Sequence, residues 1–242
     1  MARAVSQLRF DQGAASRRLL RESQVGQFPR IVTVGGERFV LLRDVFSPEI
    51  FWSTRLFSSL LPFWKDQSFL EIGCGAGVTV VAAALHGARH VVAVDINPCA
   101  VINTTLNAQL HGVADRVHAM RGDIFDSLDS EERFDAIYWN TPFIWRPNTY
   151  RYRNQLERAL FDPGYALTAR FLGEARERLS DMGRLFIGFA NFGDWPRLRI
   201  LAFKHRYKID FLGTGTGFEG RRVEFQLLEF VPLERSVRLR RK

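Results

Sequence analysis

Two short stretches of the chain hold residues whose types and spacing suit ligand binding and catalysis. The first is "LEIGCGAG", residues 70–77, where Gly73, Gly75 and Gly77 follow Glu71 in an E-x-G-x-G-x-G spacing. Glycine allows positive φ angles and lets a backbone approach a ligand closely. The dinucleotide fingerprint requires a further glycine at position 78, which is Val78, so the turn does not fit a dinucleotide site.

The second stretch is "YWNTPFIW", residues 138–145, in which Asn140, Thr141 and Pro142 stand between aromatic residues. Asparagine and proline usually mark a turn. A solvated turn has no use for so much apolar surface. We therefore expect this turn to line a binding pocket.

The elements that position both stretches alternate between strands and helices. Short apolar runs predict buried strands at 68–73, 90–96, 116–123, 134–140 and 183–190, with helices at 78–86, 98–110, 165–179 and 195–203. Two further strands, 206–213 and 221–231, are separated by the glycine-rich "GTGTG" and are expected to pair antiparallel. This order predicts an α/β fold: a Rossmann-like, doubly wound, seven-stranded, mostly parallel sheet with an antiparallel C-terminal hairpin.

A smaller N-terminal part precedes this sheet. Residues 7–22 are predicted to form a helix, and the alternating residues around Gly35 and Gly36 a β-hairpin. Ser47 is placed to cap a helix whose first turn holds Pro48 and Glu49. We divide the chain into an N-terminal extension with a segment that leads to the substrate (1–62), a cofactor-binding domain (63–232) and a basic tail (233–242).

The glycine turn and the acids after it resemble the first motifs of class I S-adenosylmethionine-dependent methyltransferases. The resemblance implies S-adenosylmethionine as the cofactor. Asp95 would accept hydrogen bonds from both ribose hydroxyls, and Asp123 one from the adenine amino group. Ile96 and Ile124 would lie on the faces of the adenine ring. Glu71 would lie near the ammonium group of the cofactor.

"NTPF" resembles the [Asn/Asp]-Pro-Pro-[aromatic] motif of methyltransferases that modify planar or amino nitrogens, the group that includes release-factor glutamine methyltransferases and small-domain methyltransferases. The resemblance implies that Asn140, beside the cofactor, and the carbonyl of Thr141 each accept an N–H of the substrate. Phe143 would stack on a planar substrate. Thr141 replaces the first proline of the motif, while Pro142 still favours extended geometry at Thr141.

Further residues are candidates for the substrate pocket. "VFSP", residues 45–48, is similar to the segment that leads into the domain in that group, which makes Phe46 a candidate. Trp139 and Trp145 would wall the pocket, and Asn191 follows a strand that ends at the same edge. Arg146 begins an Arg-rich segment that either covers the site and holds a carboxylate or phosphate, or is solvated.

The net charge of +8 lies at the ends of the chain: residues 1–30 sum to +4, residues 231–242 to +4, and the stretch between them to zero. This distribution argues against a large nucleic-acid surface around the site. The two cysteines have no metal-ligand spacing, so we expect no metal. The sequence shows no membrane-spanning run and no apolar signal core, which predicts a cytoplasmic protein without a membrane partner. The oligomeric state is not readable.

These observations leave four hypotheses open. The first is an N-methyltransferase acting on a small, amino-acid-like molecule or a natural product. Protein glutamine N-methylation is second, and methylation of a ribosomal RNA base, which needs a nucleic-acid partner, is third. The last is a catalytically inert Rossmann-like binding module.

Overall fold

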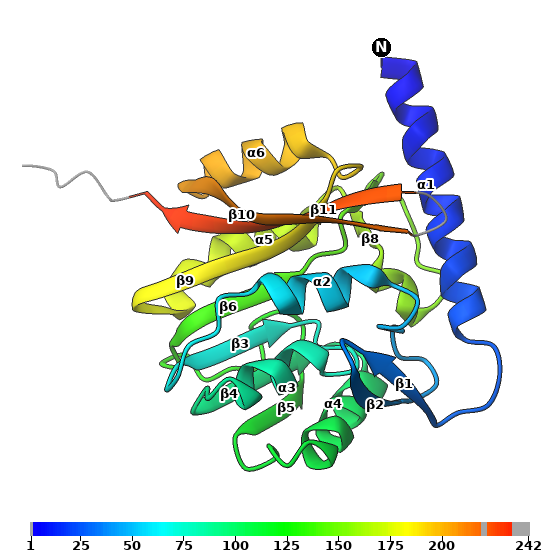
Figure 1. The fold of residues 1–242 in the computed structure, drawn as a ribbon. Coiled ribbons are helices and arrows are strands. Elements are labelled where there is room, and N and C mark those ends of the chain that lie inside the picture. The colour runs from blue at the N-terminus through cyan, green and yellow to red at the C-terminus, as the bar shows by residue number, and fades with distance from the viewer. Residues whose placement is uncertain (1, 219–221, 234–242) are drawn as a thin grey trace, which may run out of the picture.

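The computed structural model describes residues 2–218 and 222–233, without the side chains of residues 2–11 and 218. Its centre is a seven-stranded sheet in the order β10-β11-β9-β6-β3-β4-β5 (Figure 1). The parallel strands are β3 (Ser68–Ile72), β4 (His90–Asp95), β5 (Val117–Arg121), β6 (Phe134–Asn140) and β9 (Leu179–Ala190). β11 (Arg222–Pro232) runs antiparallel between β9 and β10 (Tyr207–Phe218), so the expected fold class is confirmed.

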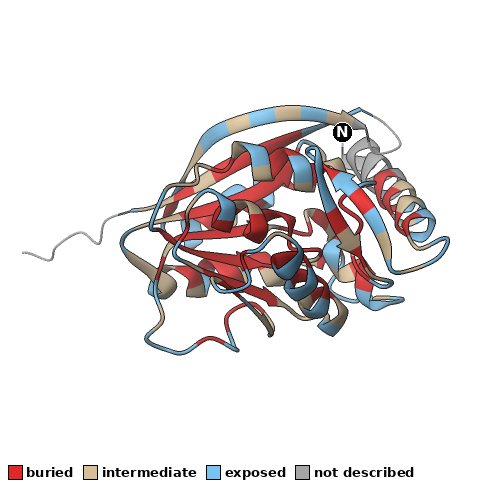
Figure 2. Cartoon of the chain, turned by 60° about the horizontal axis from the view of Figure 1, so that its bottom comes forward, coloured by how far each residue is buried: buried red, intermediate tan, exposed pale blue. Residues whose placement is uncertain are grey.

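Helices cover both faces of the sheet. α2 (Trp52–Leu60), α3 (Val78–Leu85) and α4 (Pro98–Leu110) pack on one face, and α5 (Ala166–Ala175) and α6 (Trp195–Lys204) on the other. Each face has its own apolar core, and Figure 2 shows the buried residues concentrated along the central strands. The central strands read as continuous apolar runs because both of their faces are covered.

The N-terminal part consists of α1 (Ala2–Ser23) and the hairpin of β1 (Arg30–Val34) and β2 (Glu37–Leu41). The hairpin packs on α4, where the side chains of Asn103 and Asn107 donate hydrogen bonds to the carbonyl of Val40. α1 lies at the edge of the sheet where the parallel strands end (Figure 1). It packs on a third, smaller apolar cluster that includes Leu20, Phe51, Leu156 and Phe161.

Three boundaries differ from the sequence-based expectation. The helix predicted to begin after Ser47 begins at Trp52: residues 48–50 form one isolated turn, and the Ser47 hydroxyl is buried without a hydrogen-bond partner. The helix predicted over 165–179 ends at Ala175 and continues as a 3-10 turn, η2 (Arg176–Arg178). "GTGTG" is part of β10 rather than a connection.

The glycines of β10 have a packing reason. Cβ atoms at Gly213, Gly215 and Gly217 would lie 3.0, 2.6 and 2.5 Å from side-chain atoms of Leu60, Leu56 and Trp52. The strand therefore needs glycine because α2 crosses it closely. The connection between β10 and β11 lies in residues outside the described part of the chain, and so does the predicted basic tail apart from Leu233.

The segment after β6 forms its own small structure. β7 (Ile144–Arg146) pairs in parallel with β8 (Phe161–Pro163), and a 3-10 helix, η1 (Gln155–Ala159), lies between them. None of the helices in the described ranges is both long and apolar enough to cross a bilayer.

Candidate active site at the carboxyl edge of the sheet

One pocket collects most of the candidate residues. It lies at the carboxyl ends of β3, β4, β5 and β6, the edge where ligands bind in open α/β sheets. The empty space along its lining is about 1310 Å³, part of which is open solvent at its mouth. Its lining contains the following predicted residues: Phe46, Glu71, Gly73, Gly75, Asp95, Ile96, Asp123, Ile124, Trp139, Asn140, Thr141, Pro142 and Phe143.

The glycine turn between β3 and α3 has the geometry that its sequence predicts. Gly73, Gly75 and Gly77 have φ angles of 69°, 54° and 79°. A Cβ at Gly77 would lie 3.0 Å from Thr104, whereas the space beside Gly75 is open. Gly77 therefore allows close packing of α3 on α4, and Gly75 leaves its backbone accessible from the pocket.

Glu71 is a buried acid at the base of this pocket. Burial raises the pKa of its carboxyl well above the ordinary value, while hydrogen bonds from Thr79 and from the backbone of Val80 act in the opposite direction. Its Oε2 atom is buried without a hydrogen-bond partner. A cationic ligand group in the pocket would compensate this unpaired oxygen.

Asp95 is fixed by two backbone N–H groups at the end of β4. Gly75 N donates to Oδ2 at 3.0 Å and Asn97 N donates to Oδ1 at 2.8 Å. Burial raises the pKa of Asp95, and the two N–H donors partly offset this effect. A carboxylate has about four lone-pair positions, so two remain for ligand hydroxyls. Asn97, rather than Asp95, caps α4, because its side chain accepts from Cys99 N.

Asp123 lies two residues after β5 and is tied to α5. Its Oδ1 pairs with Arg170 Nη1 at 3.2 Å, and its carbonyl accepts from Arg170 Nη2 at 2.7 Å. Ile124, which follows it, is buried with a positive φ of 62°. The ion pair uses one carboxylate oxygen of Asp123, a residue that lines the pocket.

Asn140 ends β6 beside the glycine turn. Its Nδ2 donates a hydrogen bond to Ser53 Oγ of α2 at 3.4 Å. The Oδ1 atom of Asn140 takes no part in this hydrogen bond. Ser53 lines the same pocket. No feature of the sequence distinguishes Ser53 from other serines, because the contact depends on how α2 crosses the strand ends.

Two buried hydroxyl groups hold the loop that follows Asn140. Thr141 Oγ1 donates to the carbonyl of Gly188 in β9 at 2.9 Å. Tyr165 Oη donates to the carbonyl of Phe143 at 2.6 Å and accepts from Asp194 N at 2.8 Å. The threonine hydroxyl thus supplies a tether where the related motif has a proline ring.

Aromatic residues form two walls of the pocket. Phe143 packs edge-on against Phe192, with ring centroids 5.3 Å apart. Trp139 lies below the glycine turn, where a Cβ at Gly73 would lie 3.2 Å from its Nε1. Phe46 stacks on Phe51 at 4.1 Å, so both belong to the wall before α2.

The pocket does not include three predicted substrate residues. The ring of Trp145 lies under Arg197, 5.4 Å from its guanidinium carbon. Arg146 lies beneath α1, 4.4 Å over the ring of Phe161. Asn191 is exposed and donates its backbone N–H to the carbonyl of Glu224. The strand β7 turns residues 145 and 146 away from the edge at which "NTPF" ends.

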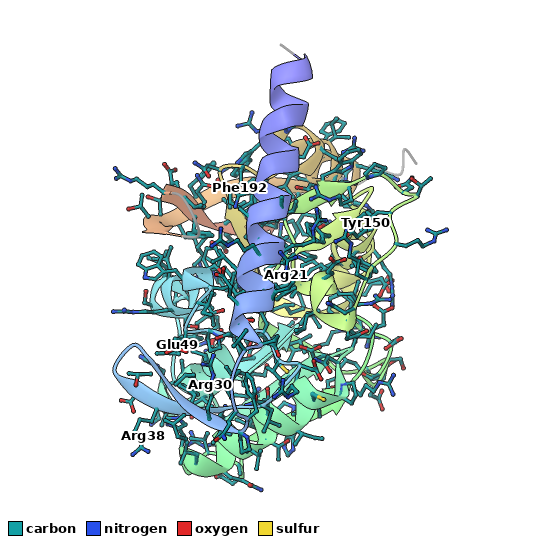
Figure 3. The ribbon with its side chains drawn as sticks, turned by 90° about the vertical axis from the view of Figure 1, so that its right-hand side faces the viewer. Arg21, Arg30, Arg38, Glu49, Tyr150 and Phe192 are labelled. Carbon is teal, nitrogen blue, oxygen red and sulfur yellow. The ribbon has the colours of Figure 1, made fainter. Side chains whose placement is uncertain are left out.

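α1 and η1 supply a cover that the sequence predicted only in part. Ser16 of α1 and residues 155, 156 and 158–160 line the pocket. Figure 3 shows α1 in front of the face of the molecule that carries Tyr150 and Phe192. Arg158, held 4.9 Å over the ring of Tyr152, brings the Arg-rich segment to the site.

The comparisons agree with this architecture. A family model described as "Methyltransferase small domain" matches residues 37–209. Among solved structures, the chain is similar to the T. thermophilus 16S rRNA N2 G1207 methyltransferase in complex with AdoMet and guanosine. The TM-score is 0.62 and the identity 19%, with coverage of 84% of this chain and 50% of that one. A ribosomal protein L11 methylase from Lactobacillus delbrueckii subsp. bulgaricus gives TM-score 0.55, 16% identity, and coverage of 77% and 81%.

Curated relatives match shorter parts. The ribosomal protein uL3 glutamine methyltransferase of Burkholderia pseudomallei is 29% identical over 173 residues, 64% of this chain and 56% of that protein. The release factor glutamine methyltransferase of Rhodopirellula baltica is 34% identical over 130 residues, 50% and 44%. A ribosomal protein L11 methyltransferase of Acinetobacter baumannii is 41% identical over 76 residues, 31% and 25%. The chain therefore spans about a quarter to about half of the length of these relatives.

Fold and site together define a Rossmann-like methyltransferase domain whose cofactor is S-adenosylmethionine. The chain belongs to the methyltransferase small domain family. The pocket fits this cofactor, because an open glycine turn, a carboxylate with free lone pairs and an unpaired buried acid oxygen lie along one groove.

Proposed function

We propose that the chain transfers a methyl group from S-adenosylmethionine to a planar nitrogen, and that the acceptor is a glutamine-type amide of a protein. The carrying observation is that Asn140 lies in the same pocket as the glycine turn and Asp95, next to a loop tethered at both ends. Two of the relatives are glutamine methyltransferases, which favours the amide over the small molecule that the sequence favoured.

The cofactor would be held by residues at and just after the carboxyl ends of β3, β4 and β5. Glu71 would face the ammonium group of the cofactor, and Asp95 would face the ribose hydroxyls. The backbone of Gly75 would approach the cofactor closely. Asp123, Ile96 and Ile124 would enclose the adenine ring. When bound there, S-adenosylmethionine supplies a methyl group on a sulfonium, which is already an activated electrophile.

The residues of the loop would act on the acceptor. An amide nitrogen is a poor nucleophile because its lone pair is delocalised into the carbonyl. Asn140 Oδ1 and the Thr141 carbonyl would each accept one N–H, which turns the lone pair toward the methyl group and stabilises the developing positive charge. Asn140 has no basic group, so its role would be orientation and charge stabilisation. As the N–C bond forms, the S–C bond would break to leave a neutral thioether, and the methylated nitrogen would release its proton to water. Phe143 would pack against the planar acceptor.

Incubation with methyl-labelled S-adenosylmethionine and separate protein, RNA and metabolite fractions tests this function. We expect label in protein, released as volatile methylamine by acid hydrolysis, since hydrolysis of an N-methyl amide yields methylamine. Label released by mild base as methanol would indicate a carboxyl ester and overturn nitrogen as the acceptor. Label confined to RNA or to metabolites would keep the methyltransferase and reject the protein amide.

A further inference from the structure

The strand β10 ends the seven-stranded sheet with an unpaired edge. It pairs with β11 on one side, and no strand of the described residues pairs with its other side. An edge of this kind offers a row of backbone N–H and C=O groups to another chain. In β10 the ladder is regular over 207–211, and the register shifts between Phe211 and Gly213.

Residues 207–211 present different chemistry on the two faces of the strand. Lys208 and Asp210 point to one face, since side chains alternate along a strand. They form an ion pair of 2.8 Å between Nζ and Oδ1, with side chains 63% and 40% exposed. Tyr207, Ile209 and Phe211 point to the opposite face, the one that α6 covers.

The face on the α6 side carries exposed apolar groups beside the open edge. Phe203 and Ile200 of α6 are 82% and 65% exposed, and Phe211 is 58% exposed. A shallow groove between α6 and β10 is lined by Trp195, Arg199, Ala202, Phe203, Tyr207, Ile209 and Phe211. Clustered exposed apolar side chains of this kind indicate a contact surface. Figure 1 shows α6 beside β10 at the top of the molecule, while the far end of β10 runs toward α1.

We propose that this edge binds a second copy of the chain, with residues 207–211 pairing antiparallel to the same residues of the partner. A two-fold axis through Ile209 places Lys208 of each copy opposite Asp210 of the other. The charges of the edge are therefore self-complementary in this register, because Lys208 of each copy lies opposite a carboxylate of the partner.

The symmetry also brings the apolar groups together. A two-fold axis perpendicular to the sheet keeps α6 of both copies on the same face. Phe203 and Ile200 of the two copies then approach each other above the strand junction, while the charge pairs lie on the opposite face. This one arrangement covers the open strand edge, the exposed apolar side chains and the groove between α6 and β10.

Sedimentation velocity on the 242-residue chain, from about 1 to about 100 μM, tests the proposal. We expect a concentration-dependent monomer–dimer equilibrium. Lys208→Asp and Asp210→Lys each place like charges opposite one another, and each should raise the dimer dissociation constant by at least about 30-fold. Both side chains are exposed, so neither change should affect folding.

Two restorations are specific to this register. A one-to-one mixture of Lys208→Asp protein with Asp210→Lys protein pairs acids with bases and should recover the dimer. The double variant, with both changes in one chain, should dimerise with itself. Arg38→Asp, on the exposed side of the β1–β2 hairpin, is the control with the same change of charge as Lys208→Asp and should leave the dissociation constant unchanged.

A wild-type protein that stays monomeric over this range overturns the proposal. A dimer that both single variants retain, or that mixing fails to restore, shows association through another surface and overturns it as well. Cofactor titration is independent of either outcome, so failure here leaves the proposed methyl transfer untouched.

Discussion

At the scale of single residues, Asn140 carries the proposed chemistry, and its replacement separates binding from turnover. Asn140→Ala should leave the affinity for S-adenosylmethionine nearly unchanged, because the proposed cofactor contacts come from other strands. Label transfer should fall by roughly 100-fold or more, the scale of losing one preorganised polar contact in a transition state. Asn140→Asp should retain more activity, because a carboxylate still accepts the N–H.

Calorimetric titration and label transfer on the same samples provide the measurement. If the alanine variant binds the cofactor and methylates at nearly the wild-type rate, "NTPF" is only a turn, and nitrogen methylation loses its support.

Thr141 tests whether a hydroxyl tether replaces the proline of the related motif. Thr141→Val keeps the shape of the side chain but leaves the carbonyl of Gly188 without its donor. Label transfer should fall by about 10-fold, with cofactor affinity unchanged, since a small displacement of the acceptor costs rate. Amide hydrogen exchange at residues 143 and 144 should become faster in the same variant.

Thr141→Ser keeps the hydroxyl and should restore both readouts. Thr141→Pro should be mild, because the carbonyl remains and the ring fixes the backbone. Exchange and turnover that are equal in the valine and serine variants would mean that the tether has no positioning role.

Glu71 is expected to destabilise the fold in exchange for cofactor binding. Burial raises the folded-state pKa of Glu71 above its unfolded-state value. The protonated side chain therefore makes its full contribution to folding stability at pH values below the unfolded-state pKa. That contribution is lost as the pH rises through the folded-state pKa. Glu71→Gln mimics the neutral form, so its melting temperature should match the wild type near pH 4 and exceed it near pH 8.

The same variant should bind S-adenosylmethionine about 10-fold more weakly at pH 8, because the ammonium group loses a charged partner. Thermal unfolding at the two pH values, without cofactor, is the measurement. A melting temperature that falls in the glutamine variant at pH 8 would contradict an unpaired, buried carboxylate.

At the scale of elements, most of the fold could be predicted from the sequence. The strands and helices from residue 68 to residue 110 follow from buried apolar runs, a glycine turn and the Asn97-Pro98 start of α4. The start of α2 could not, because Ser47 and Pro48 look like a helix cap but form an isolated turn. "GTGTG" looks like a loop, and its strand conformation depends on α2 crossing it.

The same distinction applies to the site. Residues at the ends of predicted strands lie in the pocket, because parallel strands end at one edge. Trp145, Arg146 and Asn191 lie elsewhere, because their positions depend on β7 and on the β9–α6 turn. Ser53, Tyr165 and Arg158 reach the pocket or its loop through packing between distant elements, which leaves no local pattern.

The docking of α1 can be tested at Gly13. This residue is buried in the helix interior, and a Cβ there would lie 1.6 Å from Arg146 Nη2. Gly13→Ala favours the helix by about 1 kcal/mol. It also displaces the guanidinium from the ring of Phe161, so we expect a net loss of about 1 kcal/mol.

In an Arg146→Ala background the clash is absent, and Gly13→Ala should stabilise the protein by about 0.5 to 1 kcal/mol. Urea unfolding of the wild type, Gly13→Ala, Arg146→Ala and the double variant measures the coupling free energy between the two positions. Ala14→Gly, at an exposed neighbouring position, is the control and should be additive with Arg146→Ala. Additive effects at Gly13 would show that α1 does not lie on Arg146 in solution.

At the scale of the whole molecule, half of the net positive charge lies in the C-terminal tail, apart from the pocket in sequence, and the other half lies in residues 1–30, which include α1. Residues 234–242 contribute +4 of the net charge of +8, from five basic residues and Glu234. A nucleic-acid acceptor held by this charge would bind with a steep salt dependence, because each phosphate contact releases counterions. A protein amide held in the pocket would not depend on the tail in this way.

Deletion of residues 234–242 therefore distinguishes the two kinds of acceptor. Under the proposed function, cofactor affinity and label transfer should stay within about 2-fold of the full chain from 50 to 200 mM salt. If the deletion lowers transfer by 10-fold or more and flattens its salt dependence, the acceptor is a nucleic acid anchored by the tail. If transfer falls equally at every salt concentration, the tail acts on the pocket by contact instead of by charge. Replacement of its five basic residues by glutamine, at full length, then separates the two effects, since only the charge is removed.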